Sequence, residues 1–222
     1  MCDGDKIALT DPLAIEAESF RIIDSELSPH FRFTPQEHAV VRRVVHATAD
    51  FEYARNLRFA PGCFEAFDKA YKAGASLVAD VAMVAAGVSK DLLARHGSKL
   101  LCPINDPAVA VAAKAAGHTR SIEAMRAAAL QAPGAILVIG NAPTALLEAQ
   151  RLIIAGKWKP ALVIGVPVGF VSAEESKHAL EHGHAGEVPY ITTLGRKGGS
   201  PCVVSTVNAL LLLAEGKGAV KG

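Results

Sequence analysis

Three glycine-containing loops are the segments of this sequence best suited to hold a ligand. They span residues 140–144, 165–170 and 195–200, and each follows a short segment that we expect to form a strand. If these strands run parallel, their loops lie at one edge of the sheet, where open α/β sheets bind ligands. Helix N-termini there direct backbone N–H groups at an anion, and nearby positive charge comes from Lys177, Arg196 and Lys197. Each loop alone fits a plain tight turn better, but the three together predict an anion-binding crevice.

His46 is the candidate for acid–base chemistry. We expect it near the end of a helix that begins with Thr34 as N-cap, Pro35 in the first position and Glu37 completing a capping box. A histidine titrates close to neutral pH and can accept and return a proton. The pattern alone favours a structural role, since an isolated helical histidine is usually structural.

Motifs for metals and nucleotides are missing from the sequence. Cys2, Cys63, Cys102 and Cys202 are widely spaced and form no CxxC pair, which favours a reducing compartment over a disulfide framework or a zinc site. The segment 182–184 contains two histidines, but a solvated loop explains it better than a metal. No loop matches GxGxxG or the P-loop. We therefore expect no metal and no cofactor.

The composition predicts the class of fold that positions these residues. Half of the 222 residues are hydrophobic but only 5% are aromatic, and such small aliphatic cores suit a sheet covered by helices on both faces. The length fits one α/β domain over residues 1–222, with no linker or repeat. A net charge of +1 argues against a nucleic-acid binder. The apolar runs are too short to span a membrane, and the polar N-terminus is unlike a signal peptide, so we expect a cytoplasmic protein.

The order of the expected elements indicates how the sheet is connected. Strands and helices alternate in the last third of the chain, which predicts a mainly parallel sheet. We expect strands at residues 75–84, 99–103, 135–139, 161–165 and 190–193. We expect helices at residues 11–26, from 34 to about 48, and at 63–72, 107–117, 121–131, 145–155, from 173, and at 200–213.

Five segments resemble one known family in order and spacing. They are VHAT at 45–48, IGNAPTA at 139–145, GVPVGFV at 165–171, EESK at 174–177 and GRKGGS at 195–200. Together they resemble the precorrin-8X methylmutases, and the resemblance extends from about Ile15 to Ala209. The pair formed by the second and third segments is the most specific part of it.

The resemblance implies an isomerase of vitamin B12 biosynthesis. Enzymes of this family move a methyl group from carbon 11 to carbon 12 of a precorrin macrocycle, giving hydrogenobyrinate, or cobyrinate when cobalt is already present. The shift is regarded as a sigmatropic rearrangement that needs no external cofactor, and the family forms homodimers. The family's active-site histidine matches His46, and its substrate-contacting serine matches Ser19.

The implied substrate is a large apolar disc that carries several carboxylates. It calls for an apolar cleft rimmed by backbone N–H groups and cations. His46 would protonate a ring atom and take the proton back. The residues expected to bind the substrate are Ser19, Arg120, Asn141, Thr144, Lys177, Arg196, Gly198 and Gly199.

Two other functions remain open from the sequence. The chain could be a non-catalytic tetrapyrrole carrier of the same pathway, or an unrelated nucleotide-binding α/β protein. The sequence does not fix whether the natural substrate contains cobalt, although residues 46–50 lean towards the cobalt branch.

Overall fold

A six-stranded sheet forms the centre of the computed structural model, which describes residues 11–183 and 188–218. The strand order is β1-β6-β5-β4-β2-β3, and only β1 runs antiparallel to its neighbour. The bounds are β1 (Leu57–Phe59), β2 (Leu77–Ala79), β3 (Leu100–Leu101), β4 (Ile136–Ile139), β5 (Leu162–Gly165) and β6 (Tyr190–Thr193). The expectation of a mainly parallel sheet is confirmed.

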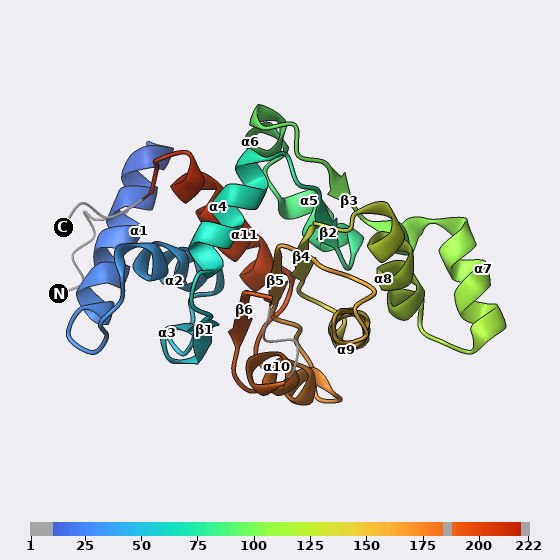
Figure 1. The fold of residues 1–222 in the computed structure, drawn as a ribbon. Helices are drawn as coiled ribbons and strands as arrows, with labels where there is room; N and C mark the ends of the chain where they lie inside the picture. The colour runs from blue at the N-terminus through green and yellow to red at the C-terminus, as the bar shows by residue number, and fades with distance from the viewer. Residues whose placement is uncertain (1–10, 184–187, 219–222) are drawn as a thin grey trace.

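Helices connect the strands and cover the sheet (Figure 1). They are α1 (Pro12–Leu27), α2 (Pro35–Thr48), α3 (Tyr53–Asn56), α4 (Cys63–Lys72), α5 (Ala82–Gly87), α6 (Lys90–Arg95), the 3-10 turn Pro103–Asn105, α7 (Pro107–Ala116), α8 (Arg120–Gln131), α9 (Pro143–Ile154), α10 (Ala173–His182) and α11 (Ser200–Ala214). The capping box predicted at Thr34 and Glu37 is present at the start of α2. None of the helices in the described ranges has the length and apolar character that crossing a bilayer requires.

The two faces of the sheet bury separate hydrophobic cores. Because successive strand residues point to opposite faces, Ile136 and Val138 pack with α2, α4 and α11, while Leu137 and Ile139 pack with α8, α9 and α10. Figure 1 shows α4 and α11 on one side of the sheet and α9 and α10 on the other. The α/β class with helices on both faces is therefore confirmed.

Several expected boundaries are wrong. The strand expected at residues 75–84 ends at Ala79, and α5 occupies the rest of that segment. At the point where the chain leaves the sheet, the carboxylate of Asp80 accepts hydrogen bonds from backbone N–H groups of the neighbouring β4 loop. Helix α8 begins at Arg120, one residue before the expected range of 121–131, and its N-cap is Thr119. No strand was expected at residues 57–59, where β1 pairs antiparallel with β6.

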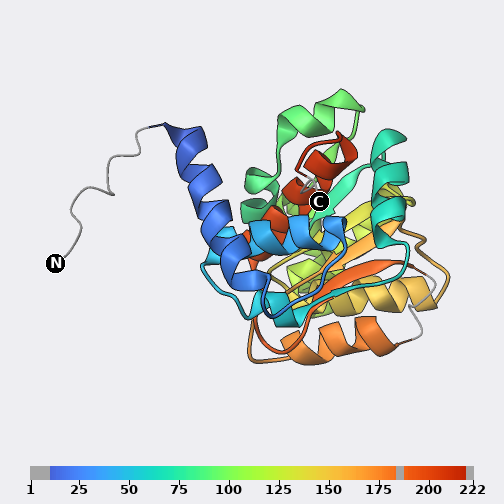
Figure 2. The ribbon, with the colours of Figure 1, turned by 90° about the vertical axis from the view of Figure 1, so that its left-hand side faces the viewer.

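Helix α1 is the least buried of the helices that border the candidate site. Only Ile23 and Leu27, near its C-terminal end, are fully buried. Figure 2 shows the N-terminal half of this helix standing away from the rest of the molecule. Its exposed apolar side chains are Leu13, Ile15 and Ile22. This half of α1 is thus available to a ligand or partner.

The carboxylate of Glu215 connects the C-terminal end of α11 to α4 and α6. Glu215 accepts hydrogen bonds from Arg95 at 2.6 Å and from the Tyr71 hydroxyl at 3.1 Å, and the His96 ring nitrogen lies 2.9 Å from it. The bond from Arg95, followed by that to His96, lowers the pKa of Glu215 to about 2.

This shift predicts a pH-dependent contribution to stability. A carboxyl with a lowered pKa stabilises the fold above its ordinary pKa and loses that contribution as pH falls through the folded value. Glu215→Gln should therefore lower the free energy of unfolding most at neutral pH, and the gap to wild type should shrink below about pH 4.5. Urea denaturation at a series of pH values measures this. Arg95→Met should also weaken the pH dependence of the free energy of unfolding. Parallel curves of this free energy against pH for wild type and Glu215→Gln would contradict the assignment.

Candidate functional site

The loops after β4, β5 and β6 pack against one another at the carboxyl edge of the sheet. A Cβ atom at Gly140 would lie 2.4 Å from Cγ1 of Val203 and 3.1 Å from the Gly199 carbonyl oxygen. The Gly199 N–H donates to the Val166 carbonyl at 2.9 Å. The three segments found in the sequence therefore meet in one layer, as parallel strands require.

Glycine is required in the β6 loop by close backbone packing. A Cβ atom at Gly198 would lie 2.1 Å from the Val166 carbonyl oxygen, and Gly199 has a φ of 116°. The Tyr53 hydroxyl donates to the Gly198 carbonyl at 3.2 Å. These contacts give both glycines a packing role, and their contact with substrate stays a prediction.

The β4 loop already holds an anion, and it belongs to the protein. The buried Asp80 carboxylate accepts from the N–H groups of Gly140 at 3.2 Å, Asn141 at 2.7 Å and Ala142 at 2.8 Å. Burial raises the pKa of Asp80, and the three N–H bonds oppose that effect. The backbone donors expected to bind a substrate anion here are thus occupied, although the Asn141 side chain is exposed.

The sequence pattern does not single out Asp80, because this residue falls inside the strand expected at residues 75–84. The available signal was an acidic residue directly after the aliphatic run Leu77–Ala79, at a strand end where carboxylates can cap a neighbouring loop. Its partner loop lies on the adjacent strand β4, far away in sequence. No local pattern identifies that partner.

His46 is exposed in the last turn of α2 and faces an aromatic ring on α1. The Phe20 ring meets it edge-on, with centroids 5.2 Å apart. The Arg42 guanidinium lies 4.4 Å from the same Phe20 ring. Ser19 precedes Phe20 and donates its hydroxyl to the Ile15 carbonyl at 2.9 Å. The structure therefore brings the segment of Ser19 to the imidazole.

An ion-pair cluster joins the end of the His46 helix to the β6 loop. The Lys197 ammonium lies 2.5 Å from the Asp50 carboxylate and 2.7 Å from that of Glu52. The bond from Lys197 lowers the pKa of Asp50, and both carboxylates raise the pKa of Lys197. Lys197 is therefore engaged within the protein, and it links the segment after α2 to the β6 loop.

The predicted binding cations differ in where the structure places them. Arg196 is exposed, and its guanidinium lies 5.6 Å from the centroid of the Phe170 ring. Lys177 is 1% exposed and donates to the Lys197 carbonyl at 2.6 Å and to the Thr193 hydroxyl at 3.2 Å. The expectation of Lys177 as a cation on the rim does not fit this placement, because its ammonium lies beneath the β6 loop.

Arg120 and Thr144 belong to helices α8 and α9, which pack on the face of the sheet opposite to α2, the helix of His46. Thr144 is in the first turn of α9, after β4, and accepts a hydrogen bond from the Thr119 hydroxyl at 3.3 Å. Arg120 is the exposed first residue of α8. Strand β5 separates β4 from β6, so these two strands are about 10 Å apart.

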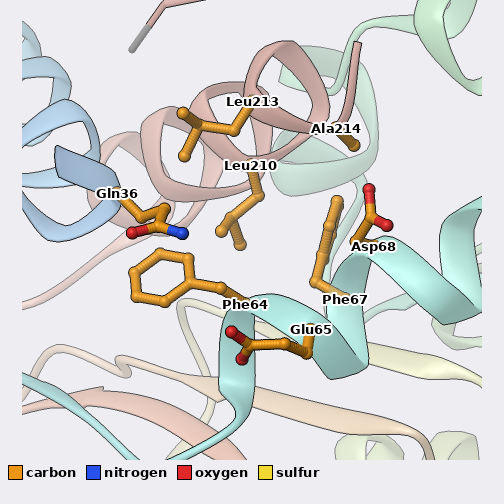
Figure 3. Close-up of a pocket in the computed structure, with 8 residues that line it drawn as sticks. All are labelled: Gln36, Phe64, Glu65, Phe67, Asp68, Leu210, Leu213 and Ala214. Atoms are coloured by element: carbon orange, nitrogen blue, oxygen red, sulfur yellow. The ribbon is translucent and has the colours of Figure 1, made fainter. Parts of the chain in front are cut away.

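A cavity of about 310 Å³ lies at the other end of α2 and α11 (Figure 3). Gln36 lines it, ten residues before His46, which places it about 15 Å away along the helix. The carboxylates of Glu65 and Asp68 line it as well, which disfavours an anionic ligand. The candidate site is therefore placed at His46 and the three loops rather than at this cavity.

Comparison with known proteins agrees with this picture. A family model described as precorrin-8X methylmutase matches residues 14–213. The chain is 48% identical to the cobalt-precorrin-8 methylmutase of Priestia megaterium, over 92% of this chain and 89% of that protein. It is 39% identical to the precorrin-8X methylmutase of Pseudomonas aeruginosa, over 91% and 96%. The crystal structure of the Thermus thermophilus precorrin-8X methyl mutase matches with a TM-score of 0.81 and 45% identity, over 93% of this chain and all of that one. The chain belongs to the precorrin-8X methylmutase family.

Proposed function

We propose that this protein is an isomerase that moves a methyl group from carbon 11 to carbon 12 of cobalt-precorrin-8. The observation that carries the proposal is the exposed His46 imidazole, held beside Phe20 and fixed against the loop layer through Asp50 and Lys197. The cobalt form is supported by the name of the Priestia megaterium relative, a cobalt-precorrin-8 methylmutase at 48% identity. Cobalt in that case belongs to the substrate.

The reaction places simple demands on the protein. One carbon–carbon bond breaks and another forms within the same molecule, so no electron acceptor or donor is consumed. His46 would protonate a ring atom to select the reactive tautomer and remove the proton after the shift, a contribution of roughly 10²–10⁴-fold. The loop layer and the apolar side chains of Val168 and Phe170, which are 44% and 85% exposed, would hold the disc in the reactive geometry.

Incubation with metal-free precorrin-8 and with its cobalt form tests the proposed activity. We expect the absorption spectrum to change to that of hydrogenobyrinate or cobyrinate, with faster turnover of the cobalt substrate. Enzyme dialysed against chelator should retain full activity, because no step needs an added metal or nucleotide. Binding without a spectral change would instead identify a carrier, and an absolute requirement for added metal or nucleotide would overturn the mechanism.

We also propose that the protein is a cytoplasmic homodimer. Exposed apolar side chains border the candidate site on α1 and on the β5 loop, and such surfaces mark sites of interaction. They are Leu13, Ile15 and Ile22 on α1, and Val171 after β5. Sedimentation equilibrium is expected to give twice the chain mass, and a monomer at micromolar concentration would contradict the proposal.

Removing the positive charge of Arg196 should weaken binding of the tetrapyrrole. Arg196→Gln is expected to raise the Kd of hydrogenobyrinate by about 5- to 150-fold at low salt, equivalent to about 1–3 kcal/mol for a lost charge-assisted hydrogen bond. Fluorescence or absorption titration measures it. Lys114→Gln, at the exposed surface of α7, is the control for a general loss of charge and should leave Kd unchanged. Equal affinity in wild type and Arg196→Gln would place this side chain outside the binding site.

A further inference from the structure

Lys177 is a buried cation in the middle of α10. Within the described residues its ammonium forms no ion pair and donates instead to the Lys197 carbonyl and the Thr193 hydroxyl. Burial lowers the pKa of Lys177 to about 8, so the ammonium is still the main form at neutral pH. Burying a cation costs free energy unless its hydrogen bonds compensate. The hydrogen bonds to these two oxygen atoms must therefore compensate for the burial of the ammonium.

One of these two oxygen atoms belongs to Lys197, the residue whose side chain reaches the end of the His46 helix. The Lys197 carbonyl accepts from Lys177 at 2.6 Å and from the Thr193 hydroxyl at 2.9 Å. The side chain of the same Lys197 extends to Asp50 and Glu52, the segment that follows α2. The carbonyl of Lys197 is thus held by Lys177 and Thr193, while the ammonium of Lys197 binds the segment that follows the His46 helix.

We propose that Lys177 is a positioning residue for His46. It acts through the backbone of Lys197, whose ion pairs set the place of α2 relative to the loop layer. The catalytic part of this inference rests on the function proposed above for His46. A direct contact between Lys177 and a substrate carboxylate is the competing role, and the 1% exposure of its side chain argues against it.

A double-mutant cycle tests the connection between the two lysines. Lys177→Met and Lys197→Met each remove an ammonium from a side chain of similar length. We expect each to lower kcat at least about tenfold, while KM and the Kd of hydrogenobyrinate stay within about threefold of wild type. The concentration of folded active sites is determined by hydrogenobyrinate titration, so that a loss of folded protein is not mistaken for a lower kcat. Since both residues act along one path, the double variant should be no slower than the slower single variant.

Two outcomes would overturn the proposal. A Kd raised more than about tenfold with kcat unchanged would assign Lys177 to direct substrate binding. Fully additive effects on kcat would show that the two lysines act independently. Lys114→Met is the matched control and should change neither constant.

Amide hydrogen exchange without substrate separates this inference from the proposed activity. Lys177→Met should speed exchange at residues 49–53 and 195–199, and unchanged protection in both segments would refute the positioning role even if the enzyme proved inactive on precorrin-8. If Lys177→Met does not fold, Thr193→Val is measured instead, because it removes the hydroxyl that bonds both Lys177 and the Lys197 carbonyl. The same increase in exchange is expected, and its absence would count against the proposal.

Discussion

Replacing His46 by alanine is expected to lower turnover by roughly 10²–10⁴-fold, the usual contribution of a positioned acid–base group. Binding of hydrogenobyrinate should remain within a few-fold of wild type, because the loop layer and Arg196 are left intact. The imidazole is exposed and its described ring contact is the edge of Phe20, so the variant should fold normally. Turnover and product titration on the same preparation measure both effects.

A histidine elsewhere on the surface provides the control for that experiment. His178→Ala removes an exposed imidazole from α10 and should leave turnover unchanged. Turnover of His46→Ala within threefold of wild type would remove this residue from the mechanism. The methyl shift would then depend on the geometry of the bound macrocycle alone.

Asp80→Asn is expected to produce the largest loss of stability among the variants considered. One carboxylate oxygen accepts from both Asn141 and Ala142, and the other from Gly140. An amide replaces one acceptor oxygen with an N–H₂ group, and each buried donor left without a partner costs about 1–3 kcal/mol. A total of about 2–4 kcal/mol would lower Tm by roughly 5–15 °C in a chain of this size.

The lost acceptor, rather than the lost charge, dominates this prediction. Burial disfavours the ionised form of Asp80, so removing the charge alone would not destabilise the fold. Calorimetry of Asp80→Asn beside Asp91→Asn, an exposed residue in the first turn of α6, separates the two effects. The second variant should change Tm by at most a degree or two. A Tm of Asp80→Asn equal to that of wild type would show that water replaces the carboxylate at the β4 loop.

The sequence by itself determined those features that depend on local physical chemistry. Thr34, Pro35 and Glu37 predict the start of α2 because a capping box satisfies its own backbone donors. The strand segments of β4, β5 and β6, separated by helices, predict a parallel sheet and hence the convergence of the three loops. The family followed from five short segments, and the comparisons confirm it. Which residues contact the substrate stays a prediction.

The tertiary structure alone decided which groups meet. Asp80 and the β4 loop are 60 residues apart in sequence, and Lys197 and Asp50 are 147 apart, so no local pattern connects them. The sequence shows Lys177 as one more cation near a loop, while packing of α10 against β6 buries its ammonium beneath Lys197. Charge is visible in a sequence, but exposure is a property of the packed chain, and exposure decides whether a cation binds a ligand or supports the protein.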